Sequence, residues 1–189
     1  MSANDFMAPF SLDIDLAEGI MRNPTNHIVR RASDMRGYYA DEAALDRLIE
    51  ENGDPVHYEV FERPVPLDQG QLMFCISKLY PGRVGDEYFF TKGHYHEVLE
   101  TAEIYLALCG RGYMLMKTPD DSLCVAETMA RGRMVYVPPC WAHRSVNTGD
   151  DPLISFCVYP GEAGHNYGDI ESQGFPKRVY FRDGKEQIV

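Results

Sequence analysis

The sequence has no long apolar run and little positive charge. None of its hydrophobic runs approaches the roughly 20 residues that a helix needs to cross a bilayer, so no membrane span is expected. The formal net charge of −11 argues against nucleic acid or an anionic membrane surface as a partner. The N-terminus shows no charged segment followed by an apolar core, so no secretory signal is expected and a cytoplasmic location is predicted.

Cysteine is also scarce, and its spacing is not that of a structural cluster. The five cysteines include no Cys-x-x-Cys pair. Four of them lie in apolar, strand-like runs, and Cys140 stands next to Trp141. This pattern predicts reduced, mostly buried thiols and argues against a disulfide scaffold or a zinc cluster.

The amino-acid composition is typical of a globular domain. Of the 189 residues, 44% are hydrophobic and 12% are aromatic. The chain shows no internal repeat and no linker long enough to divide it. We therefore expect a single domain over residues 1–189, which is long enough to bury a core.

One stretch, residues 41–52, has the pattern of a helix. Asp41 can cap its N-terminus and Gly53 can end it. Its apolar stripe is formed by Ala44, Leu45, Leu48 and Ile49. We expect this helix to pack its stripe on the core and to carry no catalytic group.

Strand patterns dominate the rest of the chain. The expected strands are residues 56–61, 72–80, 87–96, 103–109, 113–117, 123–128, 133–137, 143–147, 153–159, 178–182 and 185–189. Glycines at 110 and 112 predict a hairpin there, and Asp183-Gly184 predicts another. Many short strands with regular turns predict an all-β antiparallel sandwich or barrel over residues 56–189. Residues 1–55 are expected to form an arm and the helix, both packed on that barrel.

Two histidines stand at alternate positions within residues 91–96. Side chains at i and i+2 of a β-strand point to the same face, so His94 and His96 are expected to aim into one space. Neutral imidazoles in such a pair suit Fe, Zn, Cu and Ni. A His-x-His pair is a weak signal by itself, so its meaning depends on the residues around it.

Two blocks of sequence resemble the paired motifs of the cupin superfamily. In the first, the histidine pair is followed by Glu103 and Gly110. The second contains Gly132, Pro138, His143 and Asn147. This resemblance implies a jelly-roll β-barrel whose metal ligands are His94, His96, Glu103 and His143. The chain departs from the pattern at Tyr88 and Cys140, where glycine is usual.

The resemblance narrows to the cupin-type phosphoglucose isomerases, from about residue 30 to about residue 182. The segments that carry it are residues 31–35, 39–41, 80–88, 91–96, 102–105, 136–139, 141–144, 159–160 and 163–168. It implies an isomerase of glycolysis and gluconeogenesis that interconverts glucose 6-phosphate and fructose 6-phosphate. It also implies one divalent metal ion per subunit, Fe²⁺, with Zn²⁺, Mn²⁺ and Ni²⁺ as alternatives. Cupins often pair through edge strands, so a homodimer is expected by analogy.

The same resemblance assigns roles to individual residues. The phosphate of a small phosphorylated sugar is expected to meet neutral donors, which are the hydroxyls of Ser77 and Thr91, the Gly93 amide and the Tyr159 phenol. The expected catalytic residues are Glu103, Tyr105 and His165. Tyr167 is expected to contact the substrate beside His165.

Several alternatives stay open from the sequence. The hydrogen can move between C1 and C2 by a base and an enediolate, or as a hydride. Glu100 fits a looser cupin pattern as the carboxylate ligand, but Glu103 is expected instead, because six residues separate it from Gly110 and it opens a strand-like run. An iron-dependent cupin dioxygenase and a phosphosugar-binding cupin without activity are the alternative functions, and oxygen uptake separates the first from an isomerase.

Overall fold

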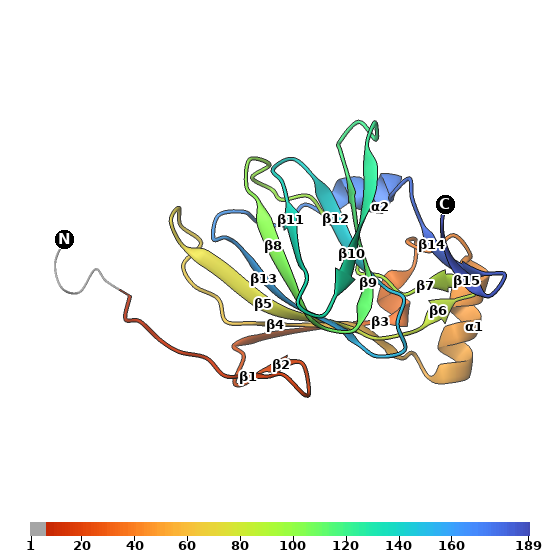
Figure 1. The fold of residues 1–189 in the computed structure, drawn as a ribbon, viewed down its shortest axis with the longest axis horizontal. Coiled ribbons are helices and arrows are strands. Elements are labelled where there is room, and N and C mark those ends of the chain that lie inside the picture. Colours follow the sequence, from red (N-terminus) through yellow and green to blue (C-terminus); the bar gives the residue numbers. More distant parts are fainter. Residues whose placement is uncertain (1–6) are drawn as a thin grey trace.

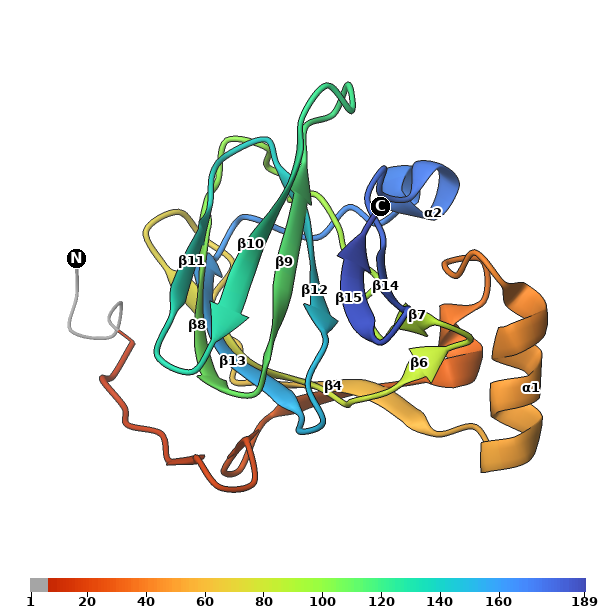
Figure 2. The same cartoon turned by 45° about the vertical axis from the view of Figure 1, so that its right-hand side comes forward.

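The computed structural model describes residues 7–189, in which two antiparallel sheets enclose most of the core (Figure 1). The larger sheet has six strands in the order β11 (Met134–Val137), β8 (Glu103–Cys109), β13 (Leu153–Pro160), β5 (Leu72–Leu79), β4 (Val56–Glu62) and β3 (Asn26–Arg31). The second has the order β10 (Cys124–Ala130), β9 (Arg111–Lys117) and β12 (Ala142–Asn147). Figure 2 shows the two sheets opposite each other. This is the predicted all-β barrel.

A smaller sheet and a two-stranded hairpin complete the fold. The smaller sheet has the order β15 (Lys185–Ile188), β14 (Val179–Arg182), β7 (Glu87–Tyr88) and β6 (Arg83–Val84). The hairpin consists of β1 (Ile14–Asp15) and β2 (Ile20–Met21). The predicted hairpin at Asp183-Gly184 is present, because β14 and β15 pair in antiparallel register across it. No helix among residues 7–189 is long and apolar enough to cross a membrane.

The predicted helix is α1 (Glu42–Asn52), and its ends are set by the expected residues. The Asp41 carboxylate accepts a hydrogen bond from the Ala44 amide at 2.8 Å. Gly53 ends the helix with φ +68°, a left-handed conformation that favours glycine. Ala44 and Leu45 are buried, and α1 lies against one end of the barrel beside β6 (Figures 1 and 2).

The N-terminal part of the chain is joined closely to the barrel. Strand β3 pairs with β4 along its whole length and forms the edge of the larger sheet. A short 3-10 helix, η1 (Ala32–Met35), links β3 to the segment before α1. The division of the domain at residue 55 stays a prediction, as does the single domain over residues 1–189, and residues 1–6 of the expected arm lie outside the described residues.

Two of the local predictions are wrong. Strands β8 and β9 do not form a hairpin at Gly110, because β8 pairs with β11 and β13 whereas β9 pairs with β10 and β12. The chain passes from one sheet to the other at this point. Residues 87–96 are not one strand, since only β7 is regular and the rest is held by single bridges, including one between His94 and His143. A second helix, α2 (Gly168–Gln173), was not predicted.

Candidate functional site

Four side chains that lie far apart in the sequence meet inside the barrel. One nitrogen or oxygen atom from each of His94, His96, Glu103 and His143 lies within 4.8 Å of the others. Glu103 begins β8 and His143 lies in β12, so the cluster joins both sheets. Glu100, the alternative carboxylate, is exposed in the loop before β8 and is not in the cluster.

Backbone pairing brings His94 and His143 together without a regular strand. The His94 amide donates to the His143 carbonyl at 3.2 Å, and the His143 amide donates to the His94 carbonyl at 3.1 Å. The two ring centroids are 4.4 Å apart, and those of His94 and His96 are 5.8 Å apart. The expected side-by-side placement of His94 and His96 is therefore present, although the strand that was expected to produce it is absent.

The donor set fits a divalent cation. Nε2 of His94 is buried and has no hydrogen-bond partner among the described residues. The Glu103 Oε2 atom lies 2.9 Å from His143 Nε2 and 3.1 Å from His96 Nε2. Two ring nitrogens gathered at one carboxylate oxygen, with a third buried ring nitrogen that has no partner, make the donor set that a divalent ion needs. The residues present fit such an ion, and its identity is a separate question.

The ionisation of the cluster also suits a cation. Burial, and then the neighbouring His143, His165 and His96 rings, lower the pKa of His94 well below its usual value. Burial alone would raise the pKa of Glu103, but the rings of His143 and His96 outweigh it and lower that pKa to about 2. The cluster thus holds a neutral His94 imidazole and an ionised Glu103 carboxylate at neutral pH, the forms that bind metal ions.

A second layer of hydrogen bonds orients His96. The Thr101 hydroxyl donates to the Val98 carbonyl at 2.6 Å, so it accepts rather than donates in its contact with His96 Nδ1 at 2.8 Å. The Thr101 carbonyl also lies 3.1 Å from His96 Nδ1. The proton of His96 is therefore placed on Nδ1, which leaves the lone pair of Nε2 facing the cluster. No sequence signal had singled out Thr101.

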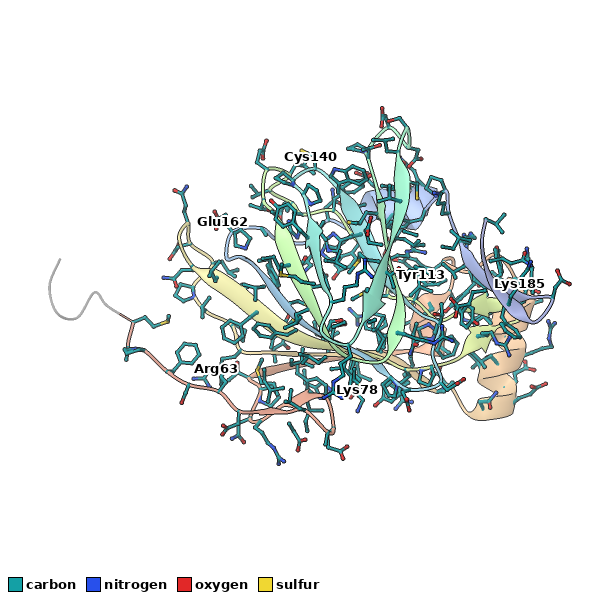
Figure 3. All side chains as sticks on the ribbon, viewed as in Figure 1. Arg63, Lys78, Tyr113, Cys140, Glu162 and Lys185 are labelled. Atoms are coloured by element: carbon teal, nitrogen blue, oxygen red, sulfur yellow. The ribbon has the colours of Figure 1, made fainter. Side chains whose placement is uncertain are left out.

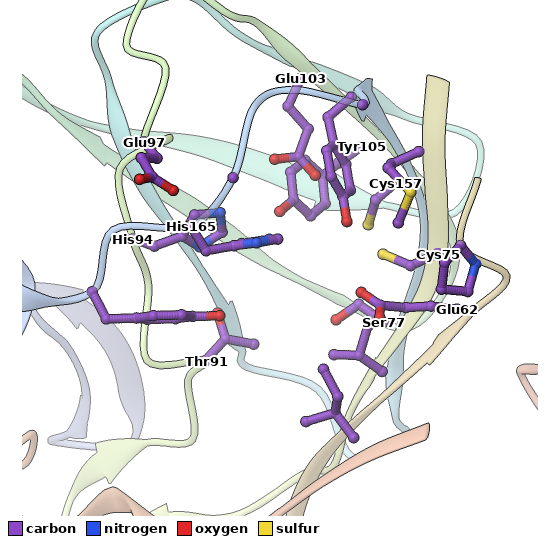
Figure 4. Close-up of a pocket in the computed structure, with 18 of the residues that line it drawn as sticks. Glu62, Cys75, Ser77, Thr91, His94, Glu97, Glu103, Tyr105, Cys157 and His165 are labelled. Atoms are coloured by element: carbon purple, nitrogen blue, oxygen red, sulfur yellow. The ribbon is translucent and has the colours of Figure 1, made fainter. Parts of the chain in front are cut away.

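The cluster opens into a cavity of about 540 Å³. The cavity lining includes all of the residues predicted to contact substrate, namely Ser77, Thr91, Gly93, Tyr105, Tyr159, His165 and Tyr167. Figure 4 shows Ser77, Thr91 and Tyr105 around one space with His94 and Glu103. The structure brings these residues together, and their individual roles stay predictions.

The cavity is lined by acids as well as by neutral donors. Glu62, Glu97 and Glu162 line it in addition to Glu103, and the lining residues that the structure describes include no lysine or arginine. Figure 3 shows Glu162 near one end of the barrel. No motif in the sequence marks these three acids as part of a site.

Thr91 and Gly93 are shaped by the neighbouring strand β12. The Ser145 amide donates to the Thr91 hydroxyl oxygen at 3.1 Å, so the hydroxyl proton remains available for another acceptor. Gly93 has φ +79°, and a Cβ there would lie 3.0 Å from atoms of Arg144, His143 and Phe175. Only glycine fits this conformation and this close approach, which places the main chain of residues 91–93 at the cavity wall.

Tyr105 lies beside His143, with ring centroids 5.6 Å apart, and His165 lies beside His94. The Tyr105 side chain shares the Glu103 face of β8, and burial, followed by the charge of Glu103, raises its pKa well above the usual value. The His165 ring stacks on Tyr167 with an interplanar angle of 9° and lies 4.5 Å from the His94 ring. Burial lowers the pKa of His165, more than the charge of Glu103 raises it. Both groups are therefore neutral at neutral pH.

A family model described as "Glucose-6-phosphate isomerase (GPI)" matches residues 29–189 of this chain. The chain belongs to the glucose-6-phosphate isomerase family. Its relatives include the glucose-6-phosphate isomerase of Thermococcus litoralis, which is 48% identical over 180 residues, 95% of this chain and 93% of the relative. The glucose-6-phosphate isomerase of Pyrococcus furiosus is 46% identical over 185 residues, 97% of this chain and 96% of the relative.

A solved structure supports the fold. An oxalate oxidase superposes with a TM-score of 0.50 at 14% identity, over 60% of this chain and 56% of that protein. At this identity the likeness concerns the fold alone. Together these comparisons confirm the predicted cupin barrel and the predicted isomerase family.

Proposed function

We propose that this chain interconverts glucose 6-phosphate and fructose 6-phosphate with one divalent metal ion held by His94, His96, Glu103 and His143. The observation that carries the proposal is that this largely buried donor set, in a member of the isomerase family, faces a cavity of about 540 Å³. A bound divalent ion would polarise the sugar oxygens and stabilise the negative charge that develops on them. We expect Fe²⁺, with Zn²⁺, Mn²⁺ and Ni²⁺ as alternatives.

The residues around the cluster have distinct proposed tasks. Thr91 offers a hydroxyl proton, and Ser77, Tyr159 and the Gly93 amide are further neutral donors for the phosphate. Neutral donors are required because the cavity is acidic and a dianion must be held without a lining lysine or arginine. The phosphate is therefore recognised by directed hydrogen bonds rather than by net charge.

Proton handling at the sugar falls to a few groups. Glu103 has a pKa of about 2, so it is a weak base and serves mainly as a ligand. Tyr105 keeps its phenol proton and can donate it to a sugar oxygen. His165 is neutral, so it can accept a proton at one nitrogen and donate at the other during ring opening, with Tyr167 holding its ring in place.

The experiment is a coupled assay on the purified chain. We expect isomerase activity with fructose 6-phosphate that chelation abolishes and Fe²⁺ restores, and no uptake of oxygen. Oxygen consumption with any small substrate would instead favour the dioxygenase alternative. Binding of the phosphosugar without turnover, in protein that elemental analysis shows to be metal-loaded, would contradict the proposed activity.

Two further features are proposed from the family relationship. We expect a homodimer in the cytoplasm, formed through an edge of the barrel. Sedimentation or light scattering of the purified chain would measure the mass, and a mass of one chain of 21.5 kDa at micromolar concentration would contradict the dimer.

A further inference from the structure

Two cysteines face each other on neighbouring strands of the larger sheet, and the proposed isomerase chemistry uses neither. Cys75 of β5 and Cys157 of β13 are direct partners in the antiparallel register. Directly opposed residues place their side chains on the same face with Cβ atoms about 4.5–5.5 Å apart. The two thiols therefore form a pair by virtue of the strand register, not by chance proximity on a surface.

The pair belongs to the wall of the substrate cavity. Both residues line it, and the next strand continues the row because Cys157 is also the register partner of Tyr105. Figure 4 shows the Cys75 and Cys157 sulfur atoms directed toward each other beside Tyr105. Both side chains are buried, and both are free thiols. A small ion that enters the cavity can thus reach the two sulfur atoms.

We propose that Cys75 and Cys157 form a dithiolate site for a soft, thiophilic metal ion, separate from the His/Glu cluster and placed so that its occupant blocks the sugar cavity. Binding breaks two S–H bonds, forms two metal–sulfur bonds and releases two protons to water, with no change of oxidation state. Thiolates select soft ions, whereas the nitrogen and oxygen donors of the cluster suit a borderline divalent ion. One cavity therefore offers two sites of different metal preference.

The environment keeps the free pair unreactive. Burial, and then the neighbouring Cys75, raise the pKa of Cys157 well above its usual value. Protonated thiols are poor nucleophiles and poor ligands, so the pair stays protonated until an ion that binds thiolate strongly enough to displace the protons arrives. Soft metal ions bind thiolate strongly enough to do so. Because the bound ion occupies the sugar cavity, the site is inhibitory rather than catalytic.

The test is a titration of the full chain with Cd²⁺, followed by ultraviolet absorption. Cadmium bound to thiolate gives a charge-transfer band that cadmium on imidazole or carboxylate does not give. We expect one equivalent per chain to develop the band in the wild type and in Cys140→Ser, whose thiol is exposed and unpaired. The band should be lost in Cys75→Ala/Cys157→Ala, and each single substitution should weaken cadmium binding at least tenfold.

Other outcomes would overturn the site. They are absence of the band in the wild type, or a band that survives in Cys75→Ala/Cys157→Ala. If the double variant does not fold, as judged by circular dichroism, Cys75→Ala and Cys157→Ala decide the question separately. Full strength of the band in both single variants would then contradict the proposal.

The blocking effect rests on the proposed isomerase function and has its own readout. Stoichiometric Cd²⁺ should abolish the activity of the wild type, and fructose 6-phosphate should slow development of the band. If the chain shows no isomerase activity under any metal condition, the proposed function fails while the absorption band still tests the site. If activity is present and a fully developed band leaves it unchanged, the blocking part of the proposal is wrong.

Discussion

Thr91 is the residue whose hydrogen bonding most directly predicts a contact with the substrate phosphate. Its hydroxyl oxygen accepts from the Ser145 amide, so its proton is free for a phosphate oxygen. We expect Thr91→Ala to raise the KM for fructose 6-phosphate with a smaller change in kcat, because a hydrogen bond to a charged group contributes about 1.5–3 kcal/mol, roughly ten- to hundredfold. Thr91→Ser keeps the hydroxyl and is the control. Steady-state kinetics that are unchanged in Thr91→Ala would place the phosphate elsewhere.

Cys140 is a non-glycine residue in a left-handed backbone conformation. It stands where glycine is usual in the resembling family, and its φ is +68°. Figure 3 shows it near the end of the barrel, and its amide donates to the Leu99 carbonyl at 2.6 Å. Left-handed backbone costs a non-glycine residue about 1–2 kcal/mol.

Cys140→Gly is therefore expected to stabilise the fold. We predict a rise in the free energy of unfolding of about 1 kcal/mol, which for a domain of this size raises Tm by about 2–4 °C. Cys140→Ala removes the thiol but keeps the Cβ, so it should leave Tm near the wild-type value. A Tm for Cys140→Gly at or below that of Cys140→Ala would show that the backbone at this position is not strained.

At the scale of elements, the segment before the cluster is held by a buried arginine. The Arg144 guanidinium lies between the rings of Phe90 and Phe175, 4.4 and 4.3 Å from their centroids. It donates to the Lys92 carbonyl at 2.8 Å, and burial, followed by Arg178, lowers its pKa to about 9. The planar, stacked head thus joins β12, the segment of residues 91–93 and the residues after α2.

Arg144→Lys is expected to weaken this connection although it keeps the charge. An ammonium group cannot stack between two rings or hold the same fork geometry, so we predict a loss of about 2 kcal/mol in the free energy of unfolding and a raised KM for the phosphosugar. Arg182→Lys is the matched control, because Arg182 lies over the Tyr180 ring but is exposed. Urea unfolding and kinetics of both variants measure this. Equal stability of Arg144→Lys and the wild type would mean that the stacking contributes nothing.

Strands were predictable from the sequence where the pattern is local. Residues 56–61 and 103–109 became β4 and β8 because alternation and β-branched residues act within one strand. The connection at residues 110–112 was not predictable, because its glycines serve distant contacts. A Cβ at Gly112 would lie 1.9 Å from the Val146 carbonyl, and one at Gly110 would lie 2.5 Å from the Pro152 carbonyl. Glycine for a tight turn and glycine for a close approach look alike in sequence.

The residues of the candidate site also fall into those that the sequence could predict and those that it could not. His94, His96, Glu103 and His143 were identified because motifs carry them. Arg144 and the Cys75–Cys157 pair were missed because their importance depends on burial and on strand register. Thr101 was missed because no motif marks the loop residue that contacts His96. Such features need the packed structure, since Cys75 and Cys157 are 82 positions apart and Arg144 and Phe90 are 54 positions apart, and they meet only when the sheets form.

At the scale of the whole molecule, the charge of the chain conflicts with the charge of its proposed substrate. A net charge of −11 and an acidic cavity lining oppose the approach of a sugar phosphate. In the proposed function, one divalent ion at the cluster and directed neutral donors around it offset this repulsion. The ion is therefore the central claim, and the carboxylate that binds it is the residue on which the claim depends most.

The most direct measurement is the metal content and isomerase turnover of Glu103→Gln beside Glu100→Gln. Glu103 is buried in the cluster at the start of β8, whereas Glu100 is an exposed acid in the loop before that strand. The two variants therefore make the same chemical change in a buried and in an exposed environment. We predict that Glu103→Gln loses the metal and nearly all turnover, and that Glu100→Gln keeps the metal and changes turnover less than about threefold. Retention of metal and turnover in Glu103→Gln, or their loss in Glu100→Gln, would contradict the account.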